Sequence, residues 1–236
     1  MLVQETLEAY DLETYELDAY ELEVYKIETL GALDGPGLRT VIFLQGCPMR
    51  CQYCHNADSW LANAGKGTMM RALSLYELVL RYKPYYKDKG GVTFSGGEAL
   101  LQAKGLLPLV KALKSVGIHT ALDTSGSIIS DDTQNLMDAI DLVILDIKAT
   151  DEALHQTLTK HSLKNPLATL ATLKAQNKPY WIRQVVLKGI NDTDAHLSQL
   201  DELTAHPTRE RLERLPYHSM GQEKWEEWQM VFRREF

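Results

Sequence analysis

Six short runs rich in apolar and β-branched residues alternate with longer amphipathic segments along this chain of 236 residues. The expected strands span residues 39–45, 92–95, 118–123, 142–147, 180–187 and 211–217. Strands that alternate with helices form parallel βαβ units with right-handed crossovers. Six units are fewer than the eight of a closed barrel, so an open or partial barrel and a doubly wound sheet are the two folds to expect.

Capping signals predict where three of the helices begin or end. Ser74 and Glu77 have the spacing of a capping box at a helix start. Ser130 precedes two aspartates, which suit the first turn of a helix. Gly117 follows the amphipathic segment 103–116 and is expected to end that helix.

The N-terminus carries a five-residue repeat in which tyrosine recurs from Tyr10 onward. A period of five fits neither a helix nor a strand. Residues 1–29 hold nine acids and one base, a balance of −8 that leaves about +1 of the net −7 for the rest of the chain. We therefore expect a disordered acidic extension over 1–21 and a core domain over 22–236, with 22–28 joining the fold as a strand.

The charge and hydropathy of the chain exclude several classes of protein. A nearly neutral body offers no electrostatic footprint for nucleic acid. No run of eighteen apolar residues predicts a membrane span, and the acidic start is unlike a secretory signal. We therefore expect a monomeric cytoplasmic protein whose partners are small molecules or other proteins.

The three cysteines of the chain, Cys47, Cys51 and Cys54, lie within eight residues in a C-x3-C-x2-C pattern. An odd and tightly clustered set argues against a disulfide framework. Thiolates are suited to iron–sulfur clusters or to zinc. A cubane cluster held by three cysteines keeps one iron open, where a small molecule can bind and receive an electron.

A zinc site built from the same cysteines and His55 is the alternative. It has suitable ligand types, but the adjacent Cys54 and His55 would strain a tetrahedral chelate. Zinc modules also usually draw two ligands from each of two separated pairs. The spacing therefore favours an iron–sulfur cluster.

Glycine and charged residues follow the carboxyl ends of nearly all the expected strands. In parallel sheets, ligands bind beyond these ends. The strand-end residues are Cys47, Gly96, Gly97, Glu98, Asp123, Asp146, Lys148 and His218. The fold and the cysteine motif thus predict a site at the same edge of the sheet.

The cysteine spacing, with the aromatic Tyr53 before the third cysteine, resembles the signature of the radical S-adenosylmethionine (SAM) superfamily. The neighbouring sequence is similar to the branch of that family that activates glycyl radical enzymes. The similar segments are 34–56, 90–102, 119–126, 141–148, 181–192 and 214–225. The resemblance implies a partial (β/α)6 TIM-like barrel of the radical SAM type. The family pattern continues into a further helix at the place where this sequence ends with Phe236. If that helix closes the barrel, its absence would weaken stability or partner docking.

The resemblance also implies the cofactors and the residues that bind them. It implies that Cys47, Cys51 and Cys54 hold a 4Fe–4S cluster and, through it, act in catalysis. The residues implied to bind S-adenosylmethionine are Tyr53, Cys54, His55, Gly96, Gly97, Glu98, Asp123, Asp146, Ile147, Lys148, Arg183 and His218. A monovalent cation beside Asp123 and Asp146 is a further implication. A purely structural ion pair is the alternative for Asp146 with Lys148 and for Arg183.

The implied activity is that of an oxidoreductase which reductively cleaves S-adenosylmethionine and removes a hydrogen atom from a backbone glycine of a partner enzyme. The implied partner is a formate acetyltransferase (pyruvate formate-lyase), which is left with a glycyl radical. Asp34, in a Pro-Gly turn, is implied to contact the target peptide. Flavodoxin or ferredoxin is the expected electron donor. The alternatives are activation of another glycyl radical enzyme and, from a different class, a zinc-binding interaction protein.

Overall fold

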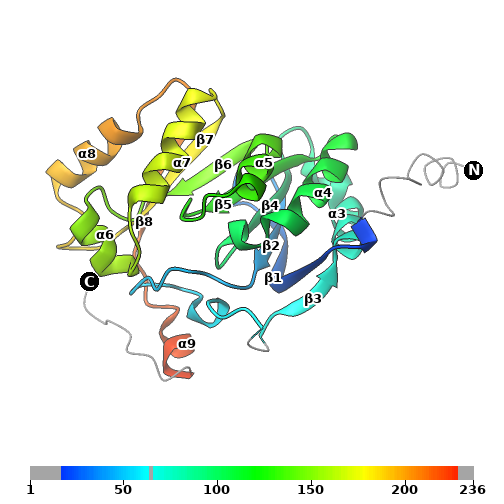
Figure 1. The fold of residues 1–236 in the computed structure, drawn as a ribbon, viewed down its shortest axis with the longest axis horizontal. Coiled ribbons are helices and arrows are strands. Elements are labelled where there is room, and N and C mark those ends of the chain that lie inside the picture. Colours follow the sequence, from blue (N-terminus) through cyan, green and yellow to red (C-terminus); the bar gives the residue numbers. More distant parts are fainter. Residues whose placement is uncertain (1–16, 64–65, 228–236) are drawn as a thin grey trace, which may run out of the picture.

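A computed structural model describes residues 17–63 and 66–227, and Figure 1 shows a sheet covered by helices. Within these residues eight strands form one sheet in the order β3-β1-β2-β4-β5-β6-β7-β8. The strands are β1 (Glu21–Gly31), β2 (Arg39–Leu44), β3 (Thr68–Arg71), β4 (Gly91–Gly96), β5 (His119–Thr124), β6 (Leu142–Asp146), β7 (Tyr180–Val186) and β8 (Arg209–Pro216). The six strands expected from the sequence are all confirmed, with ends that differ by one or two residues.

The six expected strands, β2 and β4 to β8, pair in parallel and in chain order. In a doubly wound sheet the order of successive parallel strands reverses at a switch point, whereas the parallel strands here follow one another in chain order without such a reversal. The sheet is not closed, because the described strands β3 and β8 at its two ends do not pair with each other. The fold is therefore an α/β partial barrel, which decides between the two folds left open above.

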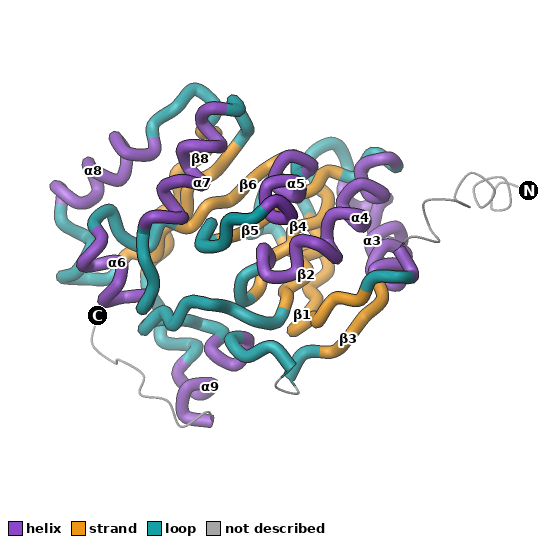
Figure 2. Tube along the Cα trace, in the orientation of Figure 1, coloured by secondary structure: helices purple, strands orange, loops and turns teal. Residues whose placement is uncertain are grey.

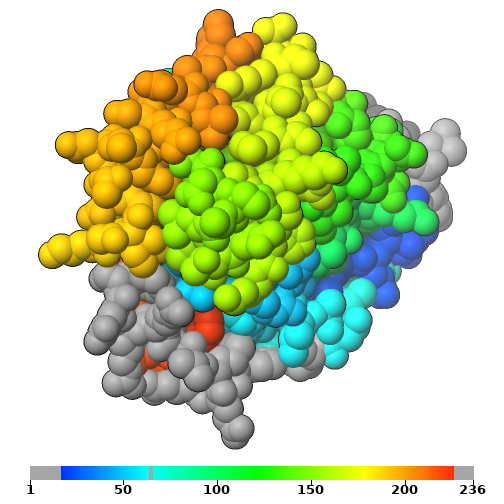
Figure 3. Space-filling model, turned by 60° about the vertical axis from the view of Figure 1, so that its left-hand side comes forward, coloured from blue at the N-terminus to red at the C-terminus, as the bar shows by residue number. Residues whose placement is uncertain are grey.

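Helices cover the outer face of the curved sheet (Figure 2). They are α3 (Ala72–Tyr86), α4 (Ala103–Ser115), α5 (Asp131–Ala139), α6 (Glu152–Thr159), α7 (Lys164–Ala175) and α8 (Asp194–Thr204). Two short 3-10 helices, η1 (Ala57–Ser59) and η2 (Ala99–Gln102), lie in loops, and α9 (Gln222–Glu227) lies near η1, apart from helices α3 to α8. Figure 3 shows α6, α7 and α8 on one face, above the surface of the segment that contains the cysteines.

Two of the three capping predictions are confirmed. The Ser130 hydroxyl accepts from the Thr133 amide at the start of α5, and Thr133 completes the capping box. α4 ends at Ser115, and Gly117 then adopts a φ of +76°.

The capping box expected at Ser74 is wrong. α3 begins two residues earlier, at Ala72, directly after strand β3. The amide of Ala72 donates to the carbonyl of Tyr20, which precedes β1, so strand pairing sets the start of the helix.

The folded body begins before the boundary expected between residues 21 and 22. Leu17 is buried in the core, Tyr20 packs against that core, and Asp18 forms an ion pair of 2.7 Å with Arg71. Residues 17–21 therefore belong to the body, whereas the rest of the expected acidic extension lies outside the described residues. Strand β3, which pairs with β1, was not expected because its four residues are mostly exposed and lack an apolar run.

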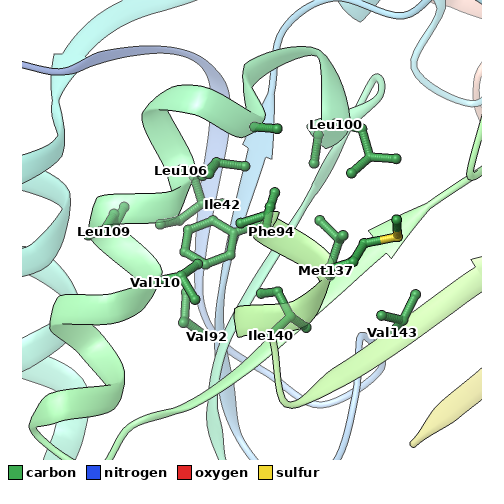
Figure 4. Close-up of a cluster of buried hydrophobic side chains, with 14 of the residues drawn as sticks. Ile42, Val92, Phe94, Leu100, Leu106, Leu109, Val110, Met137, Ile140 and Val143 are labelled. Carbon is green, nitrogen blue, oxygen red and sulfur yellow. The ribbon is translucent and has the colours of Figure 1, made fainter. Parts of the chain in front are cut away.

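The main core lies between the outer face of the sheet and the helices. Figure 4 shows Phe94 of β4 beside Ile42 of β2, with Leu106 and Val110 of α4 packed around the ring. Because side chains alternate along a strand, the intervening residues point into the barrel. These interior positions carry polar side chains of the site, such as Ser95 beside Phe94.

None of the described helices has both the length and the apolar character needed to cross a bilayer.

Candidate functional site

A cavity of about 270 Å³ lies at the carboxyl ends of the parallel strands. It is lined by thirteen of the residues named from the sequence: Asp34, Cys47, Cys51, Tyr53, Cys54, His55, Gly96, Gly97, Asp123, Asp146, Lys148, Arg183 and His218. The side chains come from loops after β2, β4, β6 and β8, from strands β5, β6 and β7, and from the loop before β2. The fold therefore brings together residues that are up to 184 positions apart in the chain, from Asp34 to His218.

The loop that carries the cysteines is tied to its surroundings through its backbone. The amide of Cys47 donates to the carbonyl of Trp60 at 2.9 Å, which closes the loop on itself. The amides of Arg50 and Gln52 donate to the carbonyls of Thr159 and Leu158, at the end of α6. These bonds hold the three thiols at the wall of the cavity, and none of the thiols is in a disulfide.

Burial is the main influence on the ionisation of the thiols. It raises the pKa of Cys51 to about 12 and raises the pKa of Cys47 and Cys54. A buried thiolate needs a positive partner, and a metal centre is such a partner. Three buried thiols on one loop therefore suit a metal-containing group.

The ligand arrangement bears on the choice between zinc and a cluster. Among the described residues no three His, Cys, Asp or Glu side chains converge at the distances of a single metal ion. The cysteines instead surround one side of the cavity, and a Cβ atom added to Gly97 would lie 3.2 Å from the Cβ of Cys47. Three thiols that line one cavity can serve as the ligands of an iron–sulfur cluster.

The glycines after β4 keep the backbone close to the cysteine loop. Gly96 has a φ of +120°, and a Cβ atom there would lie 2.2 Å from the amide nitrogen of Leu44. A Cβ atom on Gly97 would lie 2.2 Å from the carbonyl oxygen of Gly46. Only glycine fits at these two positions, because backbone atoms of the neighbouring segment occupy the place of a side chain.

Glu98 and Ile147 do not line the cavity, although the sequence placed both among the cofactor-binding residues. Glu98 is buried, and its carboxylate accepts from the Ser125 amide at 2.9 Å and from the Thr124 hydroxyl. It thus fixes the loop after β5. The side chain of Ile147 lies in the main core, and its amide donates to the carbonyl of Arg183.

Asp146 and Lys148 form a largely buried ion pair at the end of β6. Burial alone would lower the pKa of Lys148, but Asp146, together with Tyr53 and Cys51, has the larger combined effect and holds this pKa well above the ordinary value. Lys148 therefore remains a cation inside the cavity. Because both side chains line the cavity, the pair can meet a charged ligand.

Arg183 is the centre of a second charged network. Its Nη1 donates to Asp123 at 2.9 Å and to Asp34 at 3.4 Å, and its Nε donates to Glu213 at 3.0 Å. Burial raises the pKa of Asp123 to about 6, although the charge of Arg183 opposes this shift. Burial also acts to lower the pKa of Arg183. The nearby carboxylates, above all Asp123, together have the larger and opposite effect, so this pKa is raised above its ordinary value.

Two members of this network were missed from the sequence. Ser95 of β4 donates to Asp123 at 3.0 Å, and Glu213 of β8 accepts from Arg183. Both occupy inward positions of their strands, so alternation along an expected strand was the signal that could have found them. Neither follows a strand end, where the search for functional residues was concentrated.

The segment after β8 closes over the cysteine loop. The rings of His55 and His218 meet edge to face with centroids 4.7 Å apart. Further along, Trp225 of α9 donates from Nε1 to the carbonyl of Cys54 at 2.8 Å and packs against Trp60 at 5.1 Å. This segment therefore brings His218 to the cavity and covers the outer side of the cysteines.

The chain matches the model of the radical SAM superfamily over residues 41–200. It is 42% identical over 207 residues to the pyruvate formate-lyase-activating enzyme of Streptococcus mutans, covering 85% of this chain and 79% of that protein. It is 39% identical to the Clostridium pasteurianum protein of the same name, with 84% of this chain and 83% of that protein covered. The pyruvate formate-lyase 1-activating enzyme of Escherichia coli is 41% identical, with 84% and 81% covered.

Solved structures agree with the fold. A domain of the pyruvate-formate lyase-activating enzyme from Bacteroides vulgatus superposes with a TM-score of 0.50 at 28% identity, covering 57% of this chain and 89% of that one. Streptococcus suis SuiB, bound to its precursor peptide SuiA, superposes with a TM-score of 0.64 at 17% identity, covering 92% of this chain and 45% of that one. The second likeness concerns the fold alone.

Proposed function

The chain belongs to the radical SAM superfamily, and from this premise we propose that it activates pyruvate formate-lyase by generating a radical on a backbone glycine of that enzyme. Its cofactors are a 4Fe–4S cluster and S-adenosylmethionine. When bound, the cluster supplies the electron for reductive cleavage of S-adenosylmethionine, and this cleavage provides the oxidant that takes a hydrogen atom from the glycine. The relatives named as activating enzymes of pyruvate formate-lyase match this chain along most of their length.

One observation carries the proposal for the site: residues that resemble the family's motifs on separate strands line a single cavity. In this proposal Cys47, Cys51 and Cys54 would hold the cluster, which would bind S-adenosylmethionine and pass it an electron. Gly96 and Gly97 support it by letting the end of β4 lie directly against the backbone of the cysteine loop, so that both border the cavity.

The charges of the cavity suit S-adenosylmethionine, which carries an amino group, a carboxylate and a sulfonium. Lys148 and Arg183 are cations that can pair with the carboxylate. Asp34, Asp123 and Asp146 line the same cavity and favour positive groups, either the sulfonium or a monovalent cation. The chain's residues thus bind and orient the cofactor without a general acid or base.

The remaining lining residues suit the adenine of S-adenosylmethionine and the target peptide. Tyr53, His55 and His218 line the cavity, the rings of His55 and His218 touch each other, and these rings supply flat surfaces on which an adenine can stack. Asp34 lies in the loop before β2, and in this proposal it contacts the target peptide. Flavodoxin or ferredoxin delivers the electron, and the enzyme acts as a monomer.

The test is anaerobic reconstitution with iron and sulfide, followed by reduction in the presence of S-adenosylmethionine and purified pyruvate formate-lyase. We expect 5′-deoxyadenosine and a glycyl radical signal in electron paramagnetic resonance. A variant with Cys47, Cys51 and Cys54 changed to alanine is expected to give neither product, while its circular dichroism stays that of the parent.

Two outcomes would contradict the proposal. A stable zinc-loaded protein that takes up no iron and yields no 5′-deoxyadenosine would favour a binding protein. Cleavage of S-adenosylmethionine with no radical on pyruvate formate-lyase would keep the radical chemistry but point to another glycyl radical enzyme as the target.

A further inference from the structure

We infer that Glu213 is a positioning residue, which fixes the guanidinium of Arg183 so that Arg183 holds Asp34 in place beside the cavity. The inference rests on the proposed function, because Asp34 is the residue proposed to meet the target peptide. Glu213 itself does not line the cavity, so its effect must pass through Arg183.

The pairing of β7 with β8 places the two side chains together. Arg183 and Glu213 are register partners on neighbouring parallel strands. Nε of Arg183 donates to Oε2 of Glu213 at 3.0 Å, and the two side chains are only 9% and 8% exposed. Because Nε carries a single hydrogen, this bond decides the direction in which the planar guanidinium points.

The other nitrogens of the guanidinium meet the loop before β2. Nη2 donates to the carbonyl of Leu33 at 3.0 Å, and Nη1 donates to the carboxylates of Asp34 and Asp123. Arg183 therefore joins the loop, the floor of the cavity and β8. Among the described residues, it is Arg183 that donates a hydrogen bond to the Asp34 carboxylate.

The backbone of that loop has other supports that do not depend on Glu213. The hydroxyl of Thr93 donates to the carbonyl of Asp34 at 2.6 Å, and Arg39 donates to the carbonyl of Pro36 at 2.8 Å. Loss of Glu213 should therefore leave the loop in place and affect chiefly the Asp34 side chain. Asp123 also keeps its ion pair with Arg183, so the buried cation does not lose its charge partner.

Glu213 also forms an ion pair with Arg211, which lies two residues earlier on the same strand and face. Nε of Arg211 lies 3.1 Å from the other carboxylate oxygen of Glu213, and the guanidinium of Arg211 lies 4.9 Å from the ring of Trp181. A carboxylate fixed by two arginines can act as a rigid support. Replacing it by an amide removes the charge that strengthens both bonds, with almost no change in volume.

The expected consequence is poorer transfer of the hydrogen atom from the target, with normal use of the cofactor. A mobile Asp34 would hold the glycine of the target less well, and a displacement of about 1 Å can cost 100-fold in rate. For Glu213→Gln we expect the yield of glycyl radical per 5′-deoxyadenosine to fall about tenfold and the KM for pyruvate formate-lyase to rise. The dissociation constant of S-adenosylmethionine is expected to stay within about threefold, because Lys148 is untouched and Arg183 keeps its ion pair with Asp123.

Glu210→Gln is the matched control. Glu210 lies on the same strand, is also a glutamate, and accepts from Nε1 of Trp181 at 3.1 Å rather than from Arg183. The reconstituted wild-type enzyme, both variants, Asp34→Asn and the double variant E213Q/D34N are compared in one assay of radical per 5′-deoxyadenosine. If Glu213 acts through Asp34, the double variant should be no worse than Asp34→Asn alone.

The outcomes separate the inference from the proposed function. No radical on pyruvate formate-lyase with the wild-type enzyme would overturn the proposed function itself. A normal wild-type result with equal yields for Glu213→Gln and Glu210→Gln would overturn the inference, as would additive losses in the double variant. If Glu213→Gln does not fold, Glu213→Asp keeps the charge but is one methylene too short to reach Nε, and the same loss of yield is expected.

Discussion

At the scale of single residues, His155 of α6 combines full burial with the lack of a hydrogen-bond partner for either ring nitrogen among the described residues. Burial is the main cause that lowers its pKa to about 4, and the charge of Lys148 adds to the effect. The ring is therefore neutral in the folded protein at neutral pH, and proton uptake favours the unfolded chain.

This arrangement predicts a pH dependence of stability. Between the unfolded pKa of about 6.5 and the folded value of about 4, the unfolded chain binds more protons, so the free energy of unfolding falls as pH falls. His155→Leu should remove this part of the slope. Urea unfolding of the cluster-free protein from pH 7 to pH 4.5 measures it. His206→Leu, at a half-buried position after α8, is the control and should keep the slope; equal slopes in all three proteins would contradict the prediction.

At the scale of elements, α9 is tied to the cysteine loop by side chains rather than by strand pairing. Lys224 donates to Asn56 at 2.7 Å and to the hydroxyl of Tyr25 at 2.8 Å, while Trp225 donates to the carbonyl of Cys54. Trp60 and Trp225 pack with Ala57, and Cys47 and Cys54 lie against this group. The short helix thus shields one side of the site proposed for the cluster.

Trp225→Phe removes the N–H group that bonds to Cys54 but keeps most of the apolar contact. Loss of a hydrogen bond behind a metal ligand typically costs about tenfold or more in metal affinity. We expect the reconstituted cluster to decay about tenfold faster in air. The loss of its visible absorbance over time measures this decay. Trp181→Phe is the control, because Trp181 also donates a side-chain hydrogen bond but lies in a separate cluster on β7. Equal decay in the two variants would show that α9 does not protect the site.

At the scale of the whole molecule, one core joins the sheet to the outer helices. Phe94 is fully buried where β4 meets α4, so its ring contacts both layers. Phe94→Ala should lower the free energy of unfolding by about 3–5 kcal/mol, a large part of a total of about 5–15 kcal/mol. Chemical denaturation of the cluster-free protein tests this. Tyr85→Ala, at a position that is 55% exposed on α3, should change stability by about 0.5 kcal/mol or less.

Much of the fold and of the site could be predicted because the signals are local. Apolar runs of strand length predicted six strands, and parallel strands collect their carboxyl ends at one edge. Cys47, Asp123, Asp146 and His218 follow or end such runs, and the cavity includes all four. Short signals in exposed segments were less informative: strand β3 was missed, and the start of α3 follows from strand pairing rather than from Ser74.

The order of strands and helices, the cysteine motif and the residues at the strand ends follow from the amino-acid sequence, because each depends on neighbours in the chain. Which distant side chains meet depends instead on the folded structure. Arg183 contacts Asp34 across 149 positions, and Glu213 faces Arg183 only through the register of β7 with β8. These contacts depend on strand register and barrel curvature, which arise from packing of the whole core and leave no local pattern in the sequence.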